Sequence, residues 1–231
     1  MTATVNLPGR PESIDLGVEE TAVIVNDMQN GFASAGGFLD KAGFDISGAA
    51  SVTERVAVVL DVARAVGLPI FYFQNGFDAQ LNSAPEGSPI WHKSPALRLM
   101  RQRPELVGTL LTKGTWDYAI IESLKPHPED IVIDKPRANC FAGTNLDMLL
   151  RARGIRNIVV IGISSNVGVE WTMRDGLTRE YFCVMLEDAT MAAGPAFVHE
   201  ATIFNIENFI GWVSTTDDFE NAFDMAERYE D

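Results

Sequence analysis

An aspartate and a lysine each stand directly after an apolar run of the sequence, and together they could carry out acid–base chemistry. Asp27 follows the run TAVIVN, and Lys135 follows the run IVID. A single charge at the end of a buried strand costs free energy unless it is paired or hydrogen-bonded. Taken alone, Asp27 could be a helix N-cap or turn residue, and Lys135 a solvated strand end. Together, the two charges could offset each other's desolvation and hold a carboxylate ready for proton transfer.

The elements that must position these charges are indicated by apolar runs along the chain. The runs do not alternate with polar residues, which is typical of strands buried on both faces of a sheet. Helical patterns separate most of them, so we predict an α/β fold with a doubly wound, mostly parallel, six-stranded sheet and helices on both faces. The predicted strands are 21–26, 69–73, 131–134, 158–161, 182–186 and a short one near 212–213, and the predicted helices are 52–66, 144–152, 169–180, 195–205 and an acidic surface helix with a frayed end over 217–231.

The length of 231 residues suits one domain of this class, which we expect to span residues 1–231. Segment 75–115 is rich in Pro, Gly and Ser, and its length predicts a lid or binding excursion, with a plain surface excursion or an oligomer contact as the alternative. Ligands of open parallel sheets bind beyond the carboxyl ends of the strands. The residues in those places are Asp27, Gln74, Asn75, Lys135 and the turn 162–168.

The charge and cysteine content exclude some classes of partner. The formal net charge is −14, which argues against nucleic acid or an anionic membrane surface as a partner. The two cysteines, Cys140 and Cys183, form no CxxC pair and predict no disulfide, so we expect a cytoplasmic location. The N-terminal residues lack a signal-peptide pattern, and no apolar run reaches the roughly 18 residues of a membrane span.

The stretch VVIGISSNVGVEWTMRDG, residues 159–176, is typical of a strand that leads through a sharp turn into a helix. Such a turn presents one residue at the N-terminus of the helix, where a nucleophile is expected. The residue in that position is Gly168, which has no side chain.

Several segments resemble the isochorismatase-like cysteine hydrolases. The similarity rests on VNDMQNGF, on DKPRANCFAGTNLDMLLRARGIRNIVVIGISSNVGVEWTMRDG and on LEDAT, and it extends over nearly the whole chain. Within that superfamily, the segments FQNGFD, GSPIWHKS, KGTWDY and NIENFIGWVS are most similar to the ureidoacrylate amidohydrolases of pyrimidine breakdown. Biuret-type and other carbamoyl-amide hydrolases are related to these.

The resemblance implies a Cys–Asp–Lys triad that cleaves a ureido or carbamoyl amide of a small molecule. Asp27 would take the thiol proton and return it to the leaving amine, while Lys135 would lower the thiol pKa and hold the carboxylate. The backbone N–H groups of Ser164 and Gly168 would form the oxyanion hole, and the peptide bond between Ile163 and Ser164 would be cis. The resemblance implies a homo-oligomer and no cofactor.

The family pattern places the nucleophilic cysteine at Gly168, which leaves three explanations open. The chain could be an inactive Cys-to-Gly variant of an amidohydrolase. It could act without a covalent nucleophile, as isochorismatases hydrolyse a vinyl ether by protonation and water attack. It could also be a small-molecule binding protein on the same scaffold. Cys183 lies in an apolar strand and is interpreted as a core residue, whereas Cys140 would need the correct line of attack to replace the missing thiol.

Metal and substrate ligands are the last group of candidates. The metal-binding relatives carry histidines after the second strand, but NGFDAQ has none, and His92, His127 and His199 show no ligand spacing, so no metal site is predicted. A substrate site needs residues for three roles: hydrogen bonds to a ureido group, charge-assisted contacts to a carboxylate, and apolar walls. For each aromatic residue, simple packing in the core is the alternative. The candidates are Gln74, Asn75 and Asp78 for the first role, Lys93 and Arg137 for the second, and Phe32, Phe77 and Trp91 for the third, with His92 as a further pocket residue.

Overall fold

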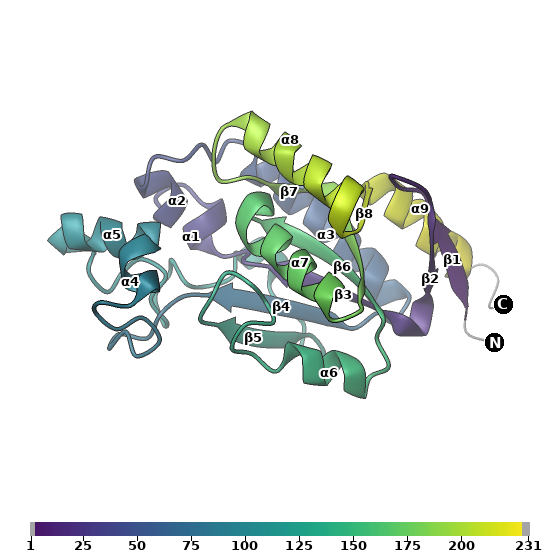
Figure 1. Cartoon of the computed structure of the whole chain (residues 1–231), viewed down its shortest axis with the longest axis horizontal. Helices are drawn as coiled ribbons and strands as arrows, with labels where there is room; N and C mark the ends of the chain where they lie inside the picture. The colour runs from purple at the N-terminus through teal and green to yellow at the C-terminus, as the bar shows by residue number, and fades with distance from the viewer. Residues whose placement is uncertain (1–2, 228–231) are drawn as a thin grey trace.

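A computed structural model of the chain describes residues 3–227 and contains a central sheet of six strands (Figure 1). The strands run in the order β5-β4-β3-β6-β7-β8, and each neighbouring pair is parallel. The prediction of a doubly wound parallel sheet is therefore confirmed. The strands are β3 (Thr21–Asn26), β4 (Ile70–Asn75), β5 (Ile131–Lys135), β6 (Asn157–Ile163), β7 (Phe182–Met191) and β8 (Trp212–Ser214).

The sheet winds outward in both directions from a seam between β3 and β6. The chain passes from β3 through β4 to β5 at one edge, and then from β6 through β7 to β8 at the other. At the carboxyl end of the seam, Asn26 lies opposite Gly162. A reversal of this kind opens a crevice beyond the strand ends. Asp27 and Ser164, which follow β3 and β6 directly, therefore lie where a ligand is expected.

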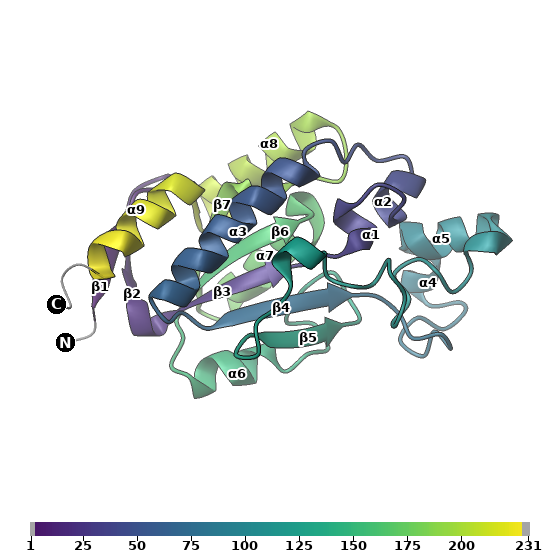
Figure 2. The same cartoon turned by 180° about the vertical axis from the view of Figure 1, so that it is seen from behind.

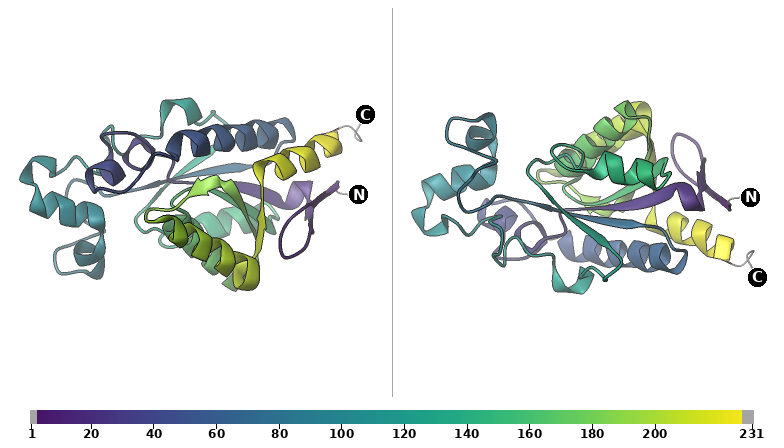
Figure 3. Two further views of the ribbon diagram at one scale, coloured as in Figure 1. Left: turned by 90° about the horizontal axis from the view of Figure 1, so that it is seen from above. Right: turned by 90° about the horizontal axis from the view of Figure 1, so that it is seen from below.

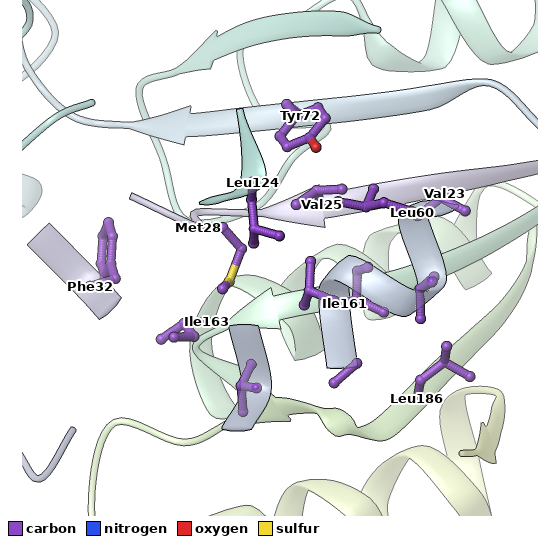
Figure 4. Packing of buried hydrophobic residues seen from close by; sticks show 14 of the residues in the cluster. Val23, Val25, Met28, Phe32, Leu60, Tyr72, Leu124, Ile161, Ile163 and Leu186 are labelled. Carbon is purple, nitrogen blue, oxygen red and sulfur yellow. The ribbon is translucent and has the colours of Figure 1, made fainter. Parts of the chain in front are cut away.

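Helices cover both faces of the sheet, as the edge-on views of Figure 3 show. Val23 and Val25 of β3 belong to one buried cluster, together with residues of α3 and α9. Ala22 and Ile24 belong to a second cluster on the opposite face, together with residues of α6 and α7. Figure 4 shows the first cluster, in which Leu60 of α3 packs near Val23 and Val25. The helices are α3 (Ala49–Ala65), α6 (Leu146–Ala152), α7 (Glu170–Thr178), α8 (Ala196–Asn205) and α9 (Thr216–Glu227).

Three details of the predicted strands were wrong. β5 is an edge strand that pairs only with β4, so residues 131–134 alternate between partly buried and exposed, and Val132 is 45% exposed. The prediction of burial on both faces fails there. β4 extends to Asn75, so that Gln74 and Asn75 end the strand instead of following it. β7 is also longer than predicted and reaches Met191.

The helices agree with the sequence pattern apart from their ends. α3 begins at Ala49 and stops before Gly67, whose φ of 73° suits glycine at the end of a helix. A π-helical turn, Ser165–Val169, precedes α7. The frayed end predicted for the last residues falls on 228–231, outside the described residues. Between residues 3 and 227, no helix is both long and apolar enough to cross a membrane.

The sequence analysis missed an antiparallel pair of short strands, β1 (Thr4–Leu7) and β2 (Ile14–Gly17). Each strand alternates buried and exposed residues over only four positions, which is too short a pattern to separate from a loop. Arg10, between the two strands, pairs with Val213 of β8 and ties this hairpin to the main sheet.

Short helices cluster beyond the carboxyl ends of β3 and β4, as the two opposite views of Figures 1 and 2 show. Ser88 and Ser94 accept hydrogen bonds from the first turns of α4 and α5, and a proline follows each serine. The excursion predicted for 75–115 therefore contains ordered helices. The helices in this cluster are α1 (Asn30–Ala33) and α2 (Phe38–Lys41), between β3 and α3, and α4 (Pro89–Lys93) and α5 (Pro95–Gln102), in the connection between β4 and β5. The 3₁₀ turns Pro104–Leu106 and Glu122–Leu124 lie in that same connection.

Candidate active site

Asp27 and Lys135 form a buried ion pair at the carboxyl end of the sheet. Asp27 Oδ2 lies 2.8 Å from Lys135 Nζ, and the two residues are 4% and 1% exposed. Asp27 has a φ of 53°, in the left-handed region, which turns the chain sharply at the end of β3. The two residues do not come from neighbouring strands, because β4 lies between β3 and β5. The lysine side chain is long enough to reach across the end of β4.

Burial and the neighbouring ammonium group shift the pKa of Asp27 in opposite directions. Burial raises the pKa of Asp27 to about 6, although Lys135 opposes the shift by charge and by hydrogen bonding. Within the described residues, Asp27 Oδ1 has no hydrogen-bond partner. A carboxylate with one oxygen anchored and the other free can accept or donate a proton near neutral pH.

The turn after β6 brings a second set of groups to the same place. The peptide bond between Ile163 and Ser164 is cis, as the family resemblance implies. Val169 N–H donates to Ser164 O at 3.2 Å, which closes the π-helical turn that carries Gly168. The Thr172 hydroxyl donates to Gly168 O at 2.6 Å and fixes the turn from the following helix.

A cavity of about 390 Å³ opens beyond the carboxyl ends of the strands, and Asp27, Ser164 and Gly168 line it. Its volume suits a small molecule, and its wall is mostly apolar with a few polar groups, as is usual for small-molecule sites. The other lining residues are Phe32, Phe38, Leu39, Phe44, Asn75, Phe77, Ile90, Lys93, Ser94, Pro95, Leu111, Pro136, Arg137, Ala138, Val167, Trp171 and Ala193.

Most of the candidates from the sequence are brought together around this cavity. Asn75 donates through Nδ2 to Arg137 O at 3.0 Å, which links the ends of β4 and β5. Arg137 itself donates through Nη1 to Ser83 O at 3.0 Å. Lys135 is paired with Asp27 and does not line the cavity. The candidates that line it are Asp27, Phe32, Asn75, Phe77, Lys93, Arg137, Ser164 and Gly168.

Four predicted substrate-binding residues lie outside the cavity wall. Gln74 donates through Nε2 to Tyr118 O at 2.9 Å. Asp78 Oδ1 accepts hydrogen bonds from Gln80 N–H and Asn82 N–H, so its carboxylate stabilises a turn. The Trp91 ring packs under the guanidinium of Arg101 at 4.5 Å, and His92 is exposed.

The two cysteine thiols are buried and lie outside the cavity wall. Cys140 Sγ is close to the ion pair and donates to Asn26 Oδ1 at 3.2 Å. Burial raises the pKa of Cys140 to about 11, so this thiol stays protonated at neutral pH. Burial raises the pKa of Cys183 to about 12, and its side chain packs in the second cluster.

The histidines lie in three different surroundings. His199 Nδ1 is 2.9 Å from Ser165 Oγ, His127 Nδ1 is 3.5 Å from Glu129 Oε1, and His92 is exposed. Over the part of the chain that the structure describes, no three His, Cys, Asp or Glu side chains are grouped so that they could hold a metal ion.

A sequence model of the isochorismatase domain matches residues 21–218. The chain belongs to the isochorismatase family. It is 54% identical over 226 residues to the ureidoacrylate amidohydrolase RutB of Azorhizobium caulinodans, covering 97% of this chain and 100% of that protein. The family resemblance inferred from the sequence motifs is therefore confirmed.

Two solved structures share the fold of this chain. A cysteine hydrolase from Pseudomonas syringae pv. phaseolicola superposes with a TM-score of 0.78 at 27% identity, covering 96% of this chain and 98% of that one. An N-carbamoylsarcosine amidase from Thermoplasma acidophilum superposes with a TM-score of 0.65 at 26% identity, covering 86% of this chain and 97% of that one.

Sequence reasoning missed several residues of this isochorismatase-family site. Asn26 is fully buried beside the ion pair, and an amide at the last position of the apolar strand TAVIVN was the available signal. Leu111 and Trp171 line the cavity from segments whose docking the sequence does not reveal. Ala138 also lines it, and its carbonyl accepts a hydrogen bond from Lys135 Nζ.

Proposed function

We propose that this chain is an amidohydrolase of the isochorismatase family with a site shaped for a small ureido or carbamoyl amide. With glycine at position 168, it binds such a substrate without forming an acyl-enzyme. The observation that carries the proposal is the buried Asp27–Lys135 pair beside the Ser164–Gly168 turn and an apolar cavity. The 54% identity to a ureidoacrylate amidohydrolase supports the substrate class.

The covalent route implied by the family resemblance needs a thiol at position 168. That thiol gives its proton to Asp27, and the sulfur attacks the carbonyl carbon of the ureido group. The C–N bond to the leaving amine breaks as its nitrogen takes the proton from Asp27. Water then gives a proton to Asp27 and attacks the carbamoyl thioester, which releases carbamate and restores the thiol. Gly168 offers no sulfur for the first step.

The remaining groups suit binding and orientation of such a substrate. Arg137 and Lys93 bring positive charge to the cavity wall, where a substrate carboxylate can form charge-assisted hydrogen bonds. Asp27 Oδ1, which has no partner among the described residues, can accept a hydrogen bond from a ureido N–H. The aromatic walls, Phe32 and Phe77, exclude water around these contacts.

Vinyl-ether hydrolysis of the isochorismatase kind is a second candidate. A protonated Asp27 would give its proton to the vinyl carbon, and water would add to the resulting oxocarbenium carbon and return a proton to Asp27. The product hemiketal then loses its alcohol as the C–O bond breaks. The raised pKa of Asp27, about 6, favours this reading because it keeps part of the carboxyl group protonated in mild acid. A non-catalytic binding protein is the third reading.

Binding and turnover measured side by side separate the first two readings. Isothermal titration with ureidoacrylate and with biuret is compared with product formation from ureidoacrylate, biuret and isochorismate. We expect binding of ureidoacrylate without turnover, and weaker binding by the Asp27→Asn variant. Isochorismate hydrolysis by the unaltered chain would establish the second candidate instead. Failure of both ureido compounds to bind would refute the amidohydrolase proposal.

A further inference from the structure

We infer that Asn26 is a positioning residue that fills the place of the missing side chain at position 168 and is matched to the glycine there. Its amide holds the Asp27–Lys135 pair and occupies the space that a side chain at 168 would need. The inference depends on the proposed amidohydrolase function only in the test that measures enzyme activity.

The first observation is the space above Gly168. A Cβ atom added to Gly168 would lie 2.2 Å from Asn26 Nδ2, 2.7 Å from Asn26 Oδ1 and 2.8 Å from Asn26 Cγ. These are its three nearest neighbours, and real Cβ atoms essentially never approach another heavy atom within 3.0 Å. The φ angle of Gly168 lies outside the left-handed region, so its backbone accepts an L-amino acid. The nearest obstacle to a side chain at 168 is therefore the Asn26 amide.

The second observation is that hydrogen bonds hold this amide in place. Asn26 Oδ1 accepts from Lys135 Nζ at 2.8 Å and from Cys140 Sγ at 3.2 Å. Asn26 Nδ2 donates to Ile163 O at 3.0 Å and to Asp27 Oδ2 at 3.3 Å. Asn26 is fully buried, so a rotation away from Gly168 would leave buried donors and acceptors without partners.

Together these observations make residues 26 and 168 a matched pair. Asn26 contacts both charges of the ion pair and the carbonyl at the start of the cis-peptide turn. A cysteine placed at 168 would have to displace that amide and disturb the ion pair that should activate the sulfur. Restoring the thiol alone is therefore insufficient, and residue 26 has to become smaller at the same time.

The direct test introduces the thiol with and without the amide. Gly168→Cys and the double variant Asn26→Ala/Gly168→Cys are treated with iodoacetamide, and alkylation at position 168 is followed by peptide mass, so that Cys140 and Cys183 do not interfere. We expect at least tenfold faster alkylation in the double variant, with the rate reaching its plateau at a lower pH. Equal rates and equal pH profiles in the two proteins would overturn the inference.

A second test needs no thiol and remains informative if the cysteine variants fold poorly. Gly168→Ala should lower the melting temperature by several degrees in the parent chain and have no such effect in the Asn26→Ala background. Gly48→Ala is the matched control, because a Cβ there meets only Met191 Sδ, at 3.8 Å, and should shift the melting temperature equally in both backgrounds. If Gly168→Ala lowered the melting temperature equally in the parent chain and in the Asn26→Ala background, that result would contradict the pairing.

The activity readout separates this inference from the proposed function. If alkylation and melting show the coupling but the parent chain does not bind ureidoacrylate and the double variant releases no ammonia from it, the pairing stands and the amidohydrolase proposal fails. If Gly168→Cys alone hydrolyses ureidoacrylate as fast as the double variant, the amidohydrolase proposal stands and the pairing fails.

Discussion

Asp27 Oδ2 and Lys135 Nζ lie 2.8 Å apart, although β4 separates β3, which Asp27 follows, from β5, which ends at Lys135. Asn26 contacts both residues, so the three side chains form one buried polar network. Such a network stabilises the fold only while every member keeps its partners, because the low dielectric of the interior makes each unpaired group costly. The same condition makes the network sensitive to single substitutions.

Removal of the buried ammonium group should destabilise the chain strongly. Lys135→Met leaves the Asp27 carboxylate buried without a counter-charge, and we expect the free energy of unfolding in urea at pH 7 to fall by about 3–5 kcal/mol. Lys125→Met, which removes an exposed pair with Glu122, is the control and should change it by less than about 1 kcal/mol. The loss for Lys135→Met should be smaller at pH 5, where Asp27 can take up a proton. Similar losses for both variants would contradict the buried pairing.

The raised pKa of Asp27 predicts how stability changes with pH. Its folded-state pKa of about 6 exceeds the ordinary value of 3.8, so the folded chain binds more protons between these values than the unfolded chain does. The contribution of Asp27 to stability is therefore greatest below about pH 4 and is lost as the pH rises through 6, by about 3 kcal/mol at most.

Urea denaturation at pH steps from 4 to 8 measures that contribution. The Asp27→Asn variant should lack this part of the pH slope, whereas Asp61→Asn, which removes an exposed carboxylate, should retain it. A parent chain and an Asp27→Asn variant with parallel pH profiles would show that Asp27 does not titrate in this way.

Arg137 should discriminate between charged and neutral ureido compounds. Arg137→Met removes a guanidinium group from the cavity wall, and we expect ureidoacrylate to bind roughly 10–100-fold more weakly, in line with the ~1.5–3 kcal/mol of a charged hydrogen bond. Binding of biuret, which has no carboxylate, should change much less. Titration calorimetry measures both, with the exposed Arg98→Met as control. If the binding of both compounds weakened equally, the role of Arg137 would be purely structural.

The native thiols should be nearly inert. Burial raises the pKa of Cys140 to about 11 and that of Cys183 to about 12, and neither side chain is accessible. At pH 8 we expect iodoacetamide to modify both at least 100-fold more slowly in the folded chain than in urea, as judged by mass spectrometry. Rapid modification of Cys140 in the folded chain would reopen its candidacy as a nucleophile.

The comparison of sequence and structure shows which inferences local patterns can support. Asp27 could be placed at a strand end because the run before it is apolar without alternation, and such runs mark the centre of a parallel sheet. Gln74 and Asn75 were both expected beyond β4, but they belong to the strand and therefore point to opposite sides. Asn75 reaches the cavity, whereas Gln74 bonds to Tyr118.

The short helices beyond the sheet show where sequence reasoning stops. Ile90 and Lys93 of α4 are three residues apart and share the face that lines the cavity, whereas Trp91 and His92 lie on other faces. A helix of five residues has too few positions to reveal from its pattern which side will dock. The place of Asn26 above Gly168 also depends on the pairing of β3 with β6, which a linear motif cannot express.

The connection between β4 and β5 supplies Phe77, Ile90, Lys93 and Leu111 to the cavity, while Asp27, Ser164 and Gly168 come from the seam of the sheet. One part of the wall that surrounds a bound molecule is thus separate from the residues that would act on it. Changes in the length or sequence of this one connection can alter which compounds the cavity accommodates while the central sheet stays unchanged. Substrate specificity can then differ among relatives that keep the same fold.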